Sequence, residues 1–268
     1  MKIVVLMGSP RKKDSFNICK EIEEQINLCG NTIDFDYVFL NDHNIKDCKG
    51  CSLCFQNSEN DCPCGDDDLN SIKNRLFSAD ALIVASPVYA YQVTGQLKGF
   101  IDRMSYLFHR QEMVGKPALI VVTTDGGGSK QVYKYLKMTM SGWGLDSVGN
   151  LQITSPMYFE NRKPKGVFGY DQNYFEKNNK KLRVISAKLV ERIKAGERRV
   201  PSFYDIFMFN CLRSKTYTSK ADYNYWEQKG WLNKDYFYDV KLNPFKRFFG
   251  RTMKGFIHLM GVRYLKNE

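Results

Sequence analysis

Residues 1–15, M-K-I-V-V-L-M-G-S-P-R-K-K-D-S, carry the first fold signal of the chain. Residues 3–7 form an uninterrupted apolar run typical of a buried strand, and Gly8 follows it directly. A helical pattern of apolar residues then extends from Asn17 to Leu28. A strand, a short turn and a helix in this order predict the first βα unit of a parallel sheet. The apolar run is too short to be the core of a signal peptide.

The same alternation of strand and helix patterns continues to about residue 199. Further strands are predicted at residues 33–40, 81–85, 118–123 and 149–153, and helices at 69–77, 95–108, 131–143 and 174–195. Repeated βα units with near-continuous apolar strands are typical of a doubly wound α/β fold, in which helices cover both faces of the sheet. We therefore predict a five-stranded parallel sheet in a first domain, residues 1–199.

Residues 200–268 differ in composition and are predicted to form a C-terminal helical extension. From Pro201 onward the chain holds 17 of its 37 aromatic residues, and 12 Lys and Arg against six Asp and Glu. Disordered segments are poor in aromatic residues, so we expect this extension to be ordered and docked. Its last segment predicts a basic amphipathic helix. The apolar residues of that helix recur at three- and four-residue spacing: Phe245, Phe248, Phe249, Thr252, Phe256 and Met260.

The apolar stripe of this last helix needs a cover. We expect the sheet domain or a second subunit to provide it, so a homo-oligomer is the favoured assembly. A membrane surface or an acidic partner is a less favoured alternative, although a basic amphipathic helix is suited to either. Nucleic acid is not expected as a partner, despite the formal net charge of +11.

The composition of the whole chain is close to the average for soluble globular proteins. Of its 268 residues, 43% are hydrophobic and 26% are charged. No apolar run approaches the roughly 20 residues that a membrane-spanning helix needs. Eight cysteines are present, five of them between Cys48 and Cys64, and a chain of this length needs no disulfides for stability. We therefore expect reduced thiols and a cytoplasmic location.

Three loops at the carboxyl edge of the predicted sheet form the candidate ligand site, because open α/β sheets bind ligands there. The loop of residues 8–15 combines backbone N–H groups and a helix start with Ser9, Arg11 and Ser15, which suits a phosphate monoester. It lacks the glycine patterns of dinucleotide-binding and ATP-binding loops. Residues 86–91 add two tyrosines for a planar ring, and residues 123–128 add three glycines that permit close backbone approach.

Four separated motifs carry a family resemblance. They are G-S-P-R-K, C-K-G-C-S-L-C, D-D-D-L-N-S-I, and the span from A-D-A-L-I-V-A-S-P-V-Y to G-Q-L-K-G-F-I-D-R. In this order they resemble the NAD(P)H-dependent FMN reductase family of flavodoxin-like proteins, over about residues 1–195. The resemblance implies strand order 2-1-3-4-5, FMN as cofactor and NAD(P)H as co-substrate.

The resemblance also implies which residues contact FMN. The phosphate would lie at residues 9–16, and the flavin ring would lie against residues 87–91 and 124–127. The cofactor-binding residues implied in this way are Ser9, Arg11, Ser15, Phe16, Asn17, Pro87, Val88, Tyr89, Ala90, Thr124, Asp125, Gly126 and Gly127. One departure is Asp14-Ser15-Phe16, where the family commonly has G-N-[ST], and Asp14 would weakly repel a phosphate.

A dense cysteine cluster is the second candidate site. Its spacing is Cys48-x2-Cys51-x2-Cys54-x7-Cys62, with Cys64 two residues further on. Four thiolates are what an iron–sulfur cluster requires, and the motif resembles the iron–sulfur flavoprotein branch of the same family. A four-iron cluster at Cys48, Cys51, Cys54 and Cys62 is therefore one interpretation. Metal-free thiols are another, and a zinc site is a third, although structural zinc sites usually have a longer spacer between ligand pairs.

These features predict an FMN-dependent NAD(P)H oxidoreductase that passes hydride from nicotinamide to flavin and on to a small electron acceptor. An alternative is an electron carrier in which flavin and an iron–sulfur cluster exchange single electrons with protein partners. A regulatory module that has lost the flavin site is a third interpretation, and Arg11 and Tyr89 argue against it. None of the three histidines belongs to a catalytic constellation, and hydride transfer by a cofactor requires none.

Overall fold

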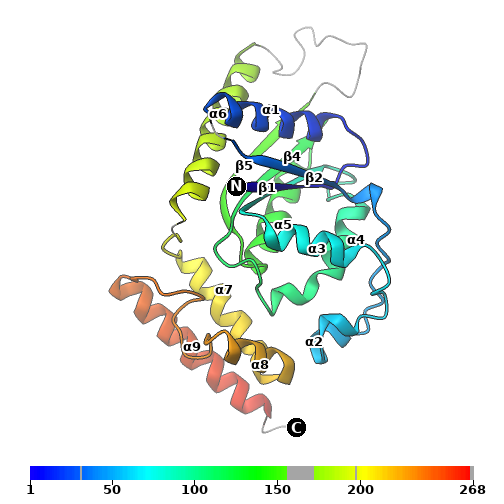
Figure 1. The fold of residues 1–268 in the computed structure, drawn as a ribbon. Coiled ribbons are helices and arrows are strands. Elements are labelled where there is room, and N and C mark those ends of the chain that lie inside the picture. Colours follow the sequence, from blue (N-terminus) through cyan, green and yellow to red (C-terminus); the bar gives the residue numbers. More distant parts are fainter. Residues whose placement is uncertain (31, 156–171, 197, 266–268) are drawn as a thin grey trace.

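A five-stranded parallel sheet forms the centre of the computed structural model, which describes residues 1–30, 32–155, 172–196 and 198–265 (Figure 1). The strands are β1 (Lys2–Met7), β2 (Asp34–Phe39), β3 (Ala81–Pro87), β4 (Pro117–Thr124) and β5 (Asp146–Thr154). Their order is β2-β1-β3-β4-β5, and all neighbouring strands are parallel. This arrangement confirms the predicted flavodoxin-like sheet. From β1 the chain adds β2 on one side, and then β3, β4 and β5 on the other side. Folds of this type bind ligands at the point between β1 and β3 where the order of the strands switches.

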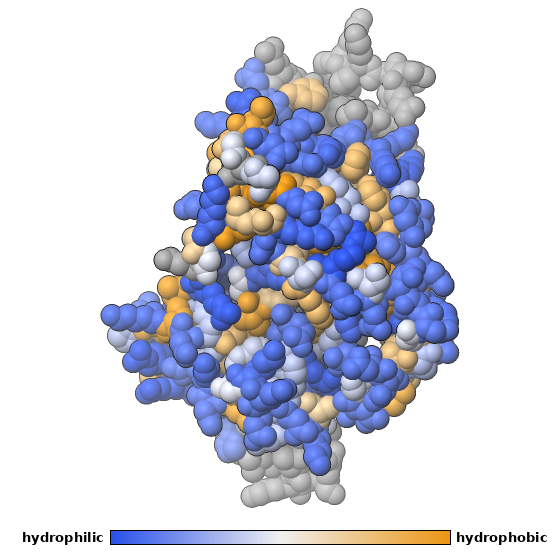
Figure 2. Space-filling model, viewed as in Figure 1, coloured by the Kyte–Doolittle hydropathy of each residue, from blue (hydrophilic) through white to orange (hydrophobic). Residues whose placement is uncertain are grey.

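Helices cover both faces of the sheet (Figure 1). One face carries α1 (Asp14–Leu28) and α6 (Gln172–Ala195), and the other carries α3 (Leu69–Ser78), α4 (Gly95–Arg103) and α5 (Ser129–Gly142). Apolar side chains on the outer surface of α1 and α6 gather on the side of the molecule that Figure 2 shows. Leu28, at the end of α1, is 79% exposed, and Val184 on α6 is 63% exposed.

The central strand β1 has an apolar sequence throughout because both of its faces are buried. Val4 and Leu6 belong to the core between the sheet and α3, α4 and α5, whereas Ile3 and Val5 belong to the core under α1 and α6. Both sets are fully buried. A strand buried on both faces has no place for the polar alternation of a half-exposed strand.

The connection from β2 to α3 contains the cysteines and is built of short elements. These are η1 (Leu40–Asp42), α2 (Leu53–Gln56) and η2 (Glu59–Asp61), and a similar turn η3 (Ser105–Phe108) follows α4. Arg103, at the end of α4, anchors this connection: its Nη1 donates to the carbonyl of Lys46 at 2.7 Å and its Nη2 to the carbonyl of Cys64 at 2.9 Å. The same guanidinium pairs with the buried carboxylate of Asp67.

The C-terminal extension consists of α7 (Phe203–Arg213), η5 (Ser214–Tyr217), α8 (Lys220–Gln228) and α9 (Pro244–Leu265). A capping box between Ser202 and Asp205 begins α7. The extension has an aromatic core of its own, in which the rings of Phe209 and Trp226 stack at a centroid distance of 5.3 Å. The other buried members of this core are Leu212, Trp231, Phe237 and Tyr238.

Helix α8 docks the extension onto the sheet domain. The buried carboxylate of Asp222 accepts a hydrogen bond from Arg110 Nε at 2.7 Å and lies 2.7 Å from His109 Nδ1. The indole Nε1 of Trp226 donates to the carbonyl of His109, also at 2.7 Å. These contacts join residues more than a hundred positions apart in the sequence, and they make the extension an ordered part of the molecule.

The apolar stripe predicted on the last helix, α9, is largely exposed to solvent. Phe245 and Phe248 are 79% and 73% exposed, so the sheet domain, one of the two predicted covers, does not cover them, and a second subunit stays a prediction. The side of α9 that packs on α7 and η5 carries Gly250 and Ile257, which are buried. Gly250 permits this close packing, because a Cβ there would lie 3.2 Å from Ile206 Cγ2. Among the helices of the described residues, none is both long enough and apolar enough to cross a membrane.

Candidate active site

A cleft of about 550 Å³ opens at the carboxyl edge of the sheet, where the loops after β1, β3 and β4 meet. Most of the predicted FMN contacts line it. The lining residues are Ser9, Arg11, Lys13, Asp14, Ser15, Pro87, Val88, Tyr89, Ala90, Thr123, Thr124 and Asp125. Lys13, Asp14 and Thr123 are additions to the predicted set, and each is a chain neighbour of a residue that the motifs identify.

The loop after β1 is held close to β3 and α4. Gly8 donates its N–H to the carbonyl of Ala85 at 2.8 Å, and its own carbonyl accepts from Thr94 Oγ1 at 2.6 Å. A Cβ on Gly8 would lie 2.9 Å from Leu97 Cδ2 and 3.2 Å from the Ala85 carbonyl oxygen, so a side chain there would require its neighbours to shift. The next residue, Ser9, folds its hydroxyl back onto the loop, donating to the carbonyl of Arg11 at 2.8 Å. These hydrogen bonds within the protein define the shape of the loop.

Helix α1 begins at the cleft, because its first residues, Asp14 and Ser15, line it. The first bond within the helix runs from the Asn17 N–H to the Lys13 carbonyl, so the N–H groups of residues 14–16 have no acceptor in the helix itself. Such a helix start favours an anion. Ser15 is buried beside it, with its hydroxyl 2.6 Å from Thr123 Oγ1 on β4.

The loop after β3 forms a tight turn that presents two tyrosines. Tyr89 and Gln92 exchange backbone hydrogen bonds of 2.9 Å, and both central residues, Ala90 and Tyr91, have positive φ. This is the geometry of a type I′ turn. The Tyr89 ring lies at the cleft and its hydroxyl accepts from Arg11 Nη2 at 3.3 Å, which links the phosphate loop to the tyrosine loop.

The glycine loop after β4 supports the tyrosine loop more than it lines the cleft. Thr124 Oγ1 donates to the carbonyl of Gly127 at 2.7 Å and accepts from the N–H of Gly126 at 3.2 Å. A Cβ on Gly127 would lie 3.4 Å from the Tyr91 ring. Of this loop, Thr124 and Asp125 line the cleft, whereas Gly126 and Gly127 are not among its lining residues.

Two more predicted contacts lie beside the cleft. The Phe16 ring packs against Tyr37 at a centroid distance of 5.3 Å and against Phe39 at 5.6 Å, so its side chain faces β2 and leaves only its backbone N–H for a ligand. Asn17 follows in the same helical turn, and its N–H is used within the helix.

Gly128 offers a test of how the tyrosine loop is supported. It has a φ of +86°, and a Cβ there would lie 2.7 Å from Val88 Cγ1. We expect Gly128→Ala to lower the free energy of unfolding by about 2 kcal/mol, because a side chain in left-handed backbone is strained and would displace Val88. Gly126→Ala is the matched control, since nothing lies within 4 Å of its Cβ position. Equal urea midpoints for the two variants would contradict this role of Gly128.

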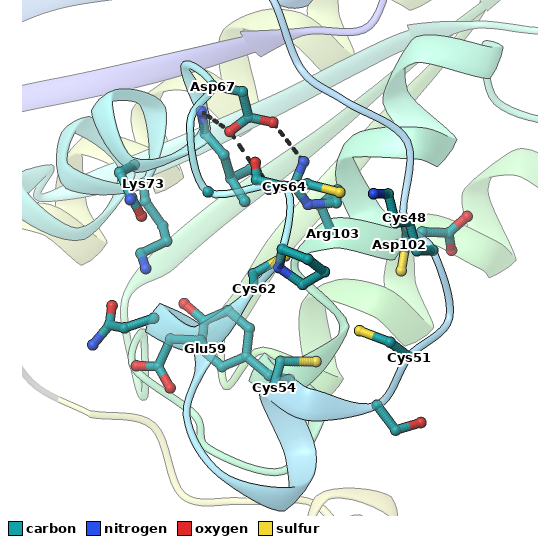
Figure 3. A pocket seen from close by; sticks show the side chains of 18 residues that line it. Cys48, Cys51, Cys54, Glu59, Cys62, Cys64, Asp67, Lys73, Asp102 and Arg103 are labelled. Carbon is teal, nitrogen blue, oxygen red and sulfur yellow. Dashed lines mark hydrogen bonds and ion pairs between the residues drawn. The ribbon is translucent and has the colours of Figure 1, made fainter.

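The cysteines surround a second cavity, of about 200 Å³. All five cysteines of the cluster line it, as do Lys49, Lys73 and Arg103. In Figure 3 the side chains of Cys48, Cys51 and Cys54 point toward one another, and Cys62 approaches from the opposite side. Cys64 differs from the others, because it is buried and its thiol donates to the carbonyl of Asp47 at 3.5 Å.

The electrostatics of the cavity reflect this crowding of thiols. Burial raises the pKa of the Cys54 thiol, and three neighbouring thiols raise it further. These neighbours are Cys48, Cys62 and Cys51. Within residues 1–30, 32–155, 172–196 and 198–265, no three His, Cys, Asp or Glu side chains converge closely enough to hold a metal ion.

The C-terminal extension braces the cysteine loop from outside. Ser219 Oγ, at the start of α8, donates to the carbonyl of Phe55 at 2.7 Å, and Arg110 Nη2 donates to the same carbonyl at 3.0 Å. Arg110 also pairs with Glu59 at 3.0 Å, and Glu59 lines the cysteine cavity. Nothing in the local sequence signals this contact, because α8 lies far from the cysteines along the chain.

Comparison with known proteins decides the family. The family model described as NADPH-dependent FMN reductase matches residues 1–160. The chain belongs to the NADPH-dependent FMN reductase family. It is thus a flavin-dependent oxidoreductase with FMN as its cofactor, which confirms the resemblance seen in the four sequence motifs.

Relatives of this reductase include several proteins named iron–sulfur flavoprotein. One from Archaeoglobus fulgidus is 29% identical over 239 residues, covering 87% of this chain and 100% of the relative. A second protein of that name from the same organism is 33% identical over 199 residues, covering 72% and 94%. One from Methanosarcina thermophila is 32% identical over 155 residues, covering 56% and 78%.

Solved structures show the same fold for this reductase at low sequence identity. RosB with a bound formylriboflavin phosphate intermediate has a TM-score of 0.57 at 14% identity, covering 91% of this chain and 92% of RosB. An FMN-dependent NADH-azoreductase from Bacillus anthracis, in complex with FMN, has a TM-score of 0.51 at 14% identity, covering 70% and 99%.

Proposed function

We propose that this reductase takes hydride from NAD(P)H onto FMN held in the three-loop cleft and passes the reducing equivalents to a small electron acceptor. The observation that carries the proposal is the meeting of the loops after β1, β3 and β4 at one cleft, with Arg11 and Tyr89 in contact across it. FMN, when bound, supplies the redox chemistry, so the chain has to bind it, orient it and admit its reaction partners.

The phosphate end of the cleft fits a phosphate monoester. Arg11 supplies a guanidinium and the start of α1 supplies backbone N–H groups, while the hydroxyls of Ser9 and Ser15 lie beside them in bonds within the protein. The carboxylate of Asp14 also lines this end, and Lys13 beside it can offset that negative charge. We assign the phosphate to these residues.

The opposite part of the cleft fits a flat ring. Pro87, Val88 and Ala90 offer apolar contact, and the Tyr89 ring, 39% exposed, offers a planar face that a ligand can cover. Thr124 and Asp125 line the other wall and supply polar atoms for the ring edge. We assign the flavin ring to the space between these two loops.

The proposed activity can be tested by anaerobic reduction of the FMN-loaded protein. We expect NADPH or NADH to bleach the visible flavin absorption, and a soluble benzoquinone added afterwards to restore it. Bleaching by dithionite together with no bleaching by either nicotinamide would contradict direct use of NAD(P)H.

Arg11→Ala should weaken FMN binding by about 1.5 to 3 kcal/mol, roughly ten- to a hundredfold in the dissociation constant, because a charge-assisted hydrogen bond to the phosphate is lost. The measurement is quenching of FMN fluorescence on titration into flavin-free protein. Lys12→Ala is the control, since Lys12 carries the same charge one residue away but lies over the Phe39 ring, outside the cleft. Unchanged affinity in Arg11→Ala would place the phosphate elsewhere.

The cysteine cavity favours a second function, electron transfer through an iron–sulfur cluster. Thiols from four positions face one cavity, and several relatives are named iron–sulfur flavoprotein. We assign the ligands to Cys48, Cys51, Cys54 and Cys62, because Cys64 is buried and already bonded to a backbone carbonyl. A carrier of this kind would exchange single electrons with a protein partner.

A further inference from the structure

Helix α9 presents an apolar face that no other part of the described chain covers. Its exposed fractions are 79% for Phe245, 73% for Phe248, 57% for Phe256, 50% for Leu259 and 52% for Met260. Soluble proteins rarely expose apolar side chains in such a contiguous group unless the surface has a partner.

The geometry of the helix explains why this face is left outside. At 3.6 residues per turn, the exposed apolar residues fall on one side of α9, and Gly250 and Ile257 fall on another. That second side is held against the extension: a Cβ on Gly261 would lie 2.8 Å from the Tyr217 ring, and His258 Nδ1 lies 2.9 Å from the Tyr217 hydroxyl. Docking of α9 therefore fixes the apolar side outward.

The apolar surface continues onto α7. Phe203 is 48% exposed and Phe207 is 40% exposed, and both belong to the first two turns of α7. The Phe203 ring lies 5.5 Å from the Phe249 ring of α9, which joins the two helices into a single surface. We call Phe203, Phe207, Phe245, Phe248, Phe256, Leu259 and Met260 the aromatic face.

Positive charge borders the aromatic face. The segment of α9 contains five Lys and Arg and no Asp or Glu. Arg247 and Arg251 fall on one flank of the apolar side, and both are exposed. Lys246 lies on the other flank, with its Nζ 5.9 Å from the centre of the Phe203 ring. The side of the extension that Figure 2 shows is mainly hydrophilic, as an amphipathic surface helix requires.

We propose that the aromatic face binds the surface of a membrane that contains anionic lipid, with α9 lying in the plane of the interface. Exposed aromatic rings flanked by cations are the features of helices that bind in this way. A second copy of the chain is a poorer occupant, because it would bring a helix of the same charge against this one. Binding of this kind would locate the redox function of the protein at a membrane surface.

The test uses the full, FMN-loaded protein and vesicles in a sedimentation assay. We expect binding to vesicles of phosphatidylcholine with phosphatidylglycerol and little binding to vesicles of phosphatidylcholine alone. The double variant Phe245→Ser/Phe248→Ser should weaken binding about tenfold or more, and Arg247→Gln/Arg251→Gln should do the same at low salt. Phe175→Ser is the matched control, since Phe175 is 42% exposed on α6, far from α9 in the sequence.

Folding of each variant is checked by its FMN content and urea midpoint, which should match those of the wild type. No binding to either vesicle, or equal binding to both, would overturn the proposal. So would a dimer of the wild type that Phe245→Ser/Phe248→Ser converts to monomer without any vesicle binding, because the face would then be an interface between copies. Binding to an acidic polypeptide at concentrations where anionic vesicles do not bind would also overturn it.

Discussion

Asp222→Asn is expected to lower the free energy of unfolding by about 3 kcal/mol and to loosen the C-terminal extension. The Asp222 side chain is fully buried and pairs with Arg110 and His109 at 2.7 Å each. Removing one partner of a buried ion pair leaves the other charge buried without full compensation, which costs about 3–5 kcal/mol. We place the effect at the lower end because Arg110 keeps its contact with Glu59.

The measurement combines urea unfolding with limited trypsin digestion. Loosening of α8 should speed cleavage at Lys215, Lys220 and Lys229, which lie in or beside it. Asp239→Asn provides the control, because Asp239 is 91% exposed in its pair with Lys234 and surface pairs of this kind contribute little. A midpoint for Asp222→Asn equal to that of Asp239→Asn would show that the extension is held by its aromatic contacts alone.

Cys54→Ala is expected to abolish the proposed iron–sulfur cluster while leaving FMN in place. Its thiol has the other three proposed ligands as neighbours, and a cluster held by three cysteines is no longer fully ligated. The cleft for FMN is built from other loops, so flavin content should stay at the wild-type level. The measurement is iron, acid-labile sulfide and flavin per chain in protein purified without oxygen.

Two other cysteines make the cluster experiment specific. Cys29→Ala should keep full iron content, because Cys29 lies outside the cysteine cavity. Cys64→Ala should also keep it, since that thiol is bonded to the Asp47 carbonyl. Full iron and sulfide in Cys54→Ala would refute the ligand assignment. Loss of iron from Cys64→Ala, together with full iron in Cys62→Ala, would show that Cys64 is the fourth ligand and Cys62 is not.

Much of the fold was predictable because a strand that is buried on both faces has an uninterrupted apolar sequence. Residues 3–7 and 118–122 are apolar without interruption, and each is a central strand of the sheet. The loops at the carboxyl edge were predictable for a related reason, since parallel strands place their following loops on the same edge. The sequence alone therefore predicted that Ser9, Arg11 and Tyr89 lie close together. In the structure all three line one cleft.

Features set by contacts between distant segments could not be predicted in this way. The spacing of Phe245, Phe248 and Phe256 indicates one side of a helix, but not whether that side packs or stays exposed. Here the close packing of Gly250 on α7 decides the orientation. The ring of Phe16 is a second case, because its packing against Tyr37 depends on where β2 lies and not on the loop motif.

Binding of FMN in the three-loop cleft can be measured by a fluorescence titration of flavin-free protein with FMN. We predict saturable quenching with a single FMN per chain, and a dissociation constant that Arg11→Ala raises while Lys12→Ala leaves it unchanged. Absence of quenching, or quenching that Arg11→Ala does not affect, would contradict the account of this cleft.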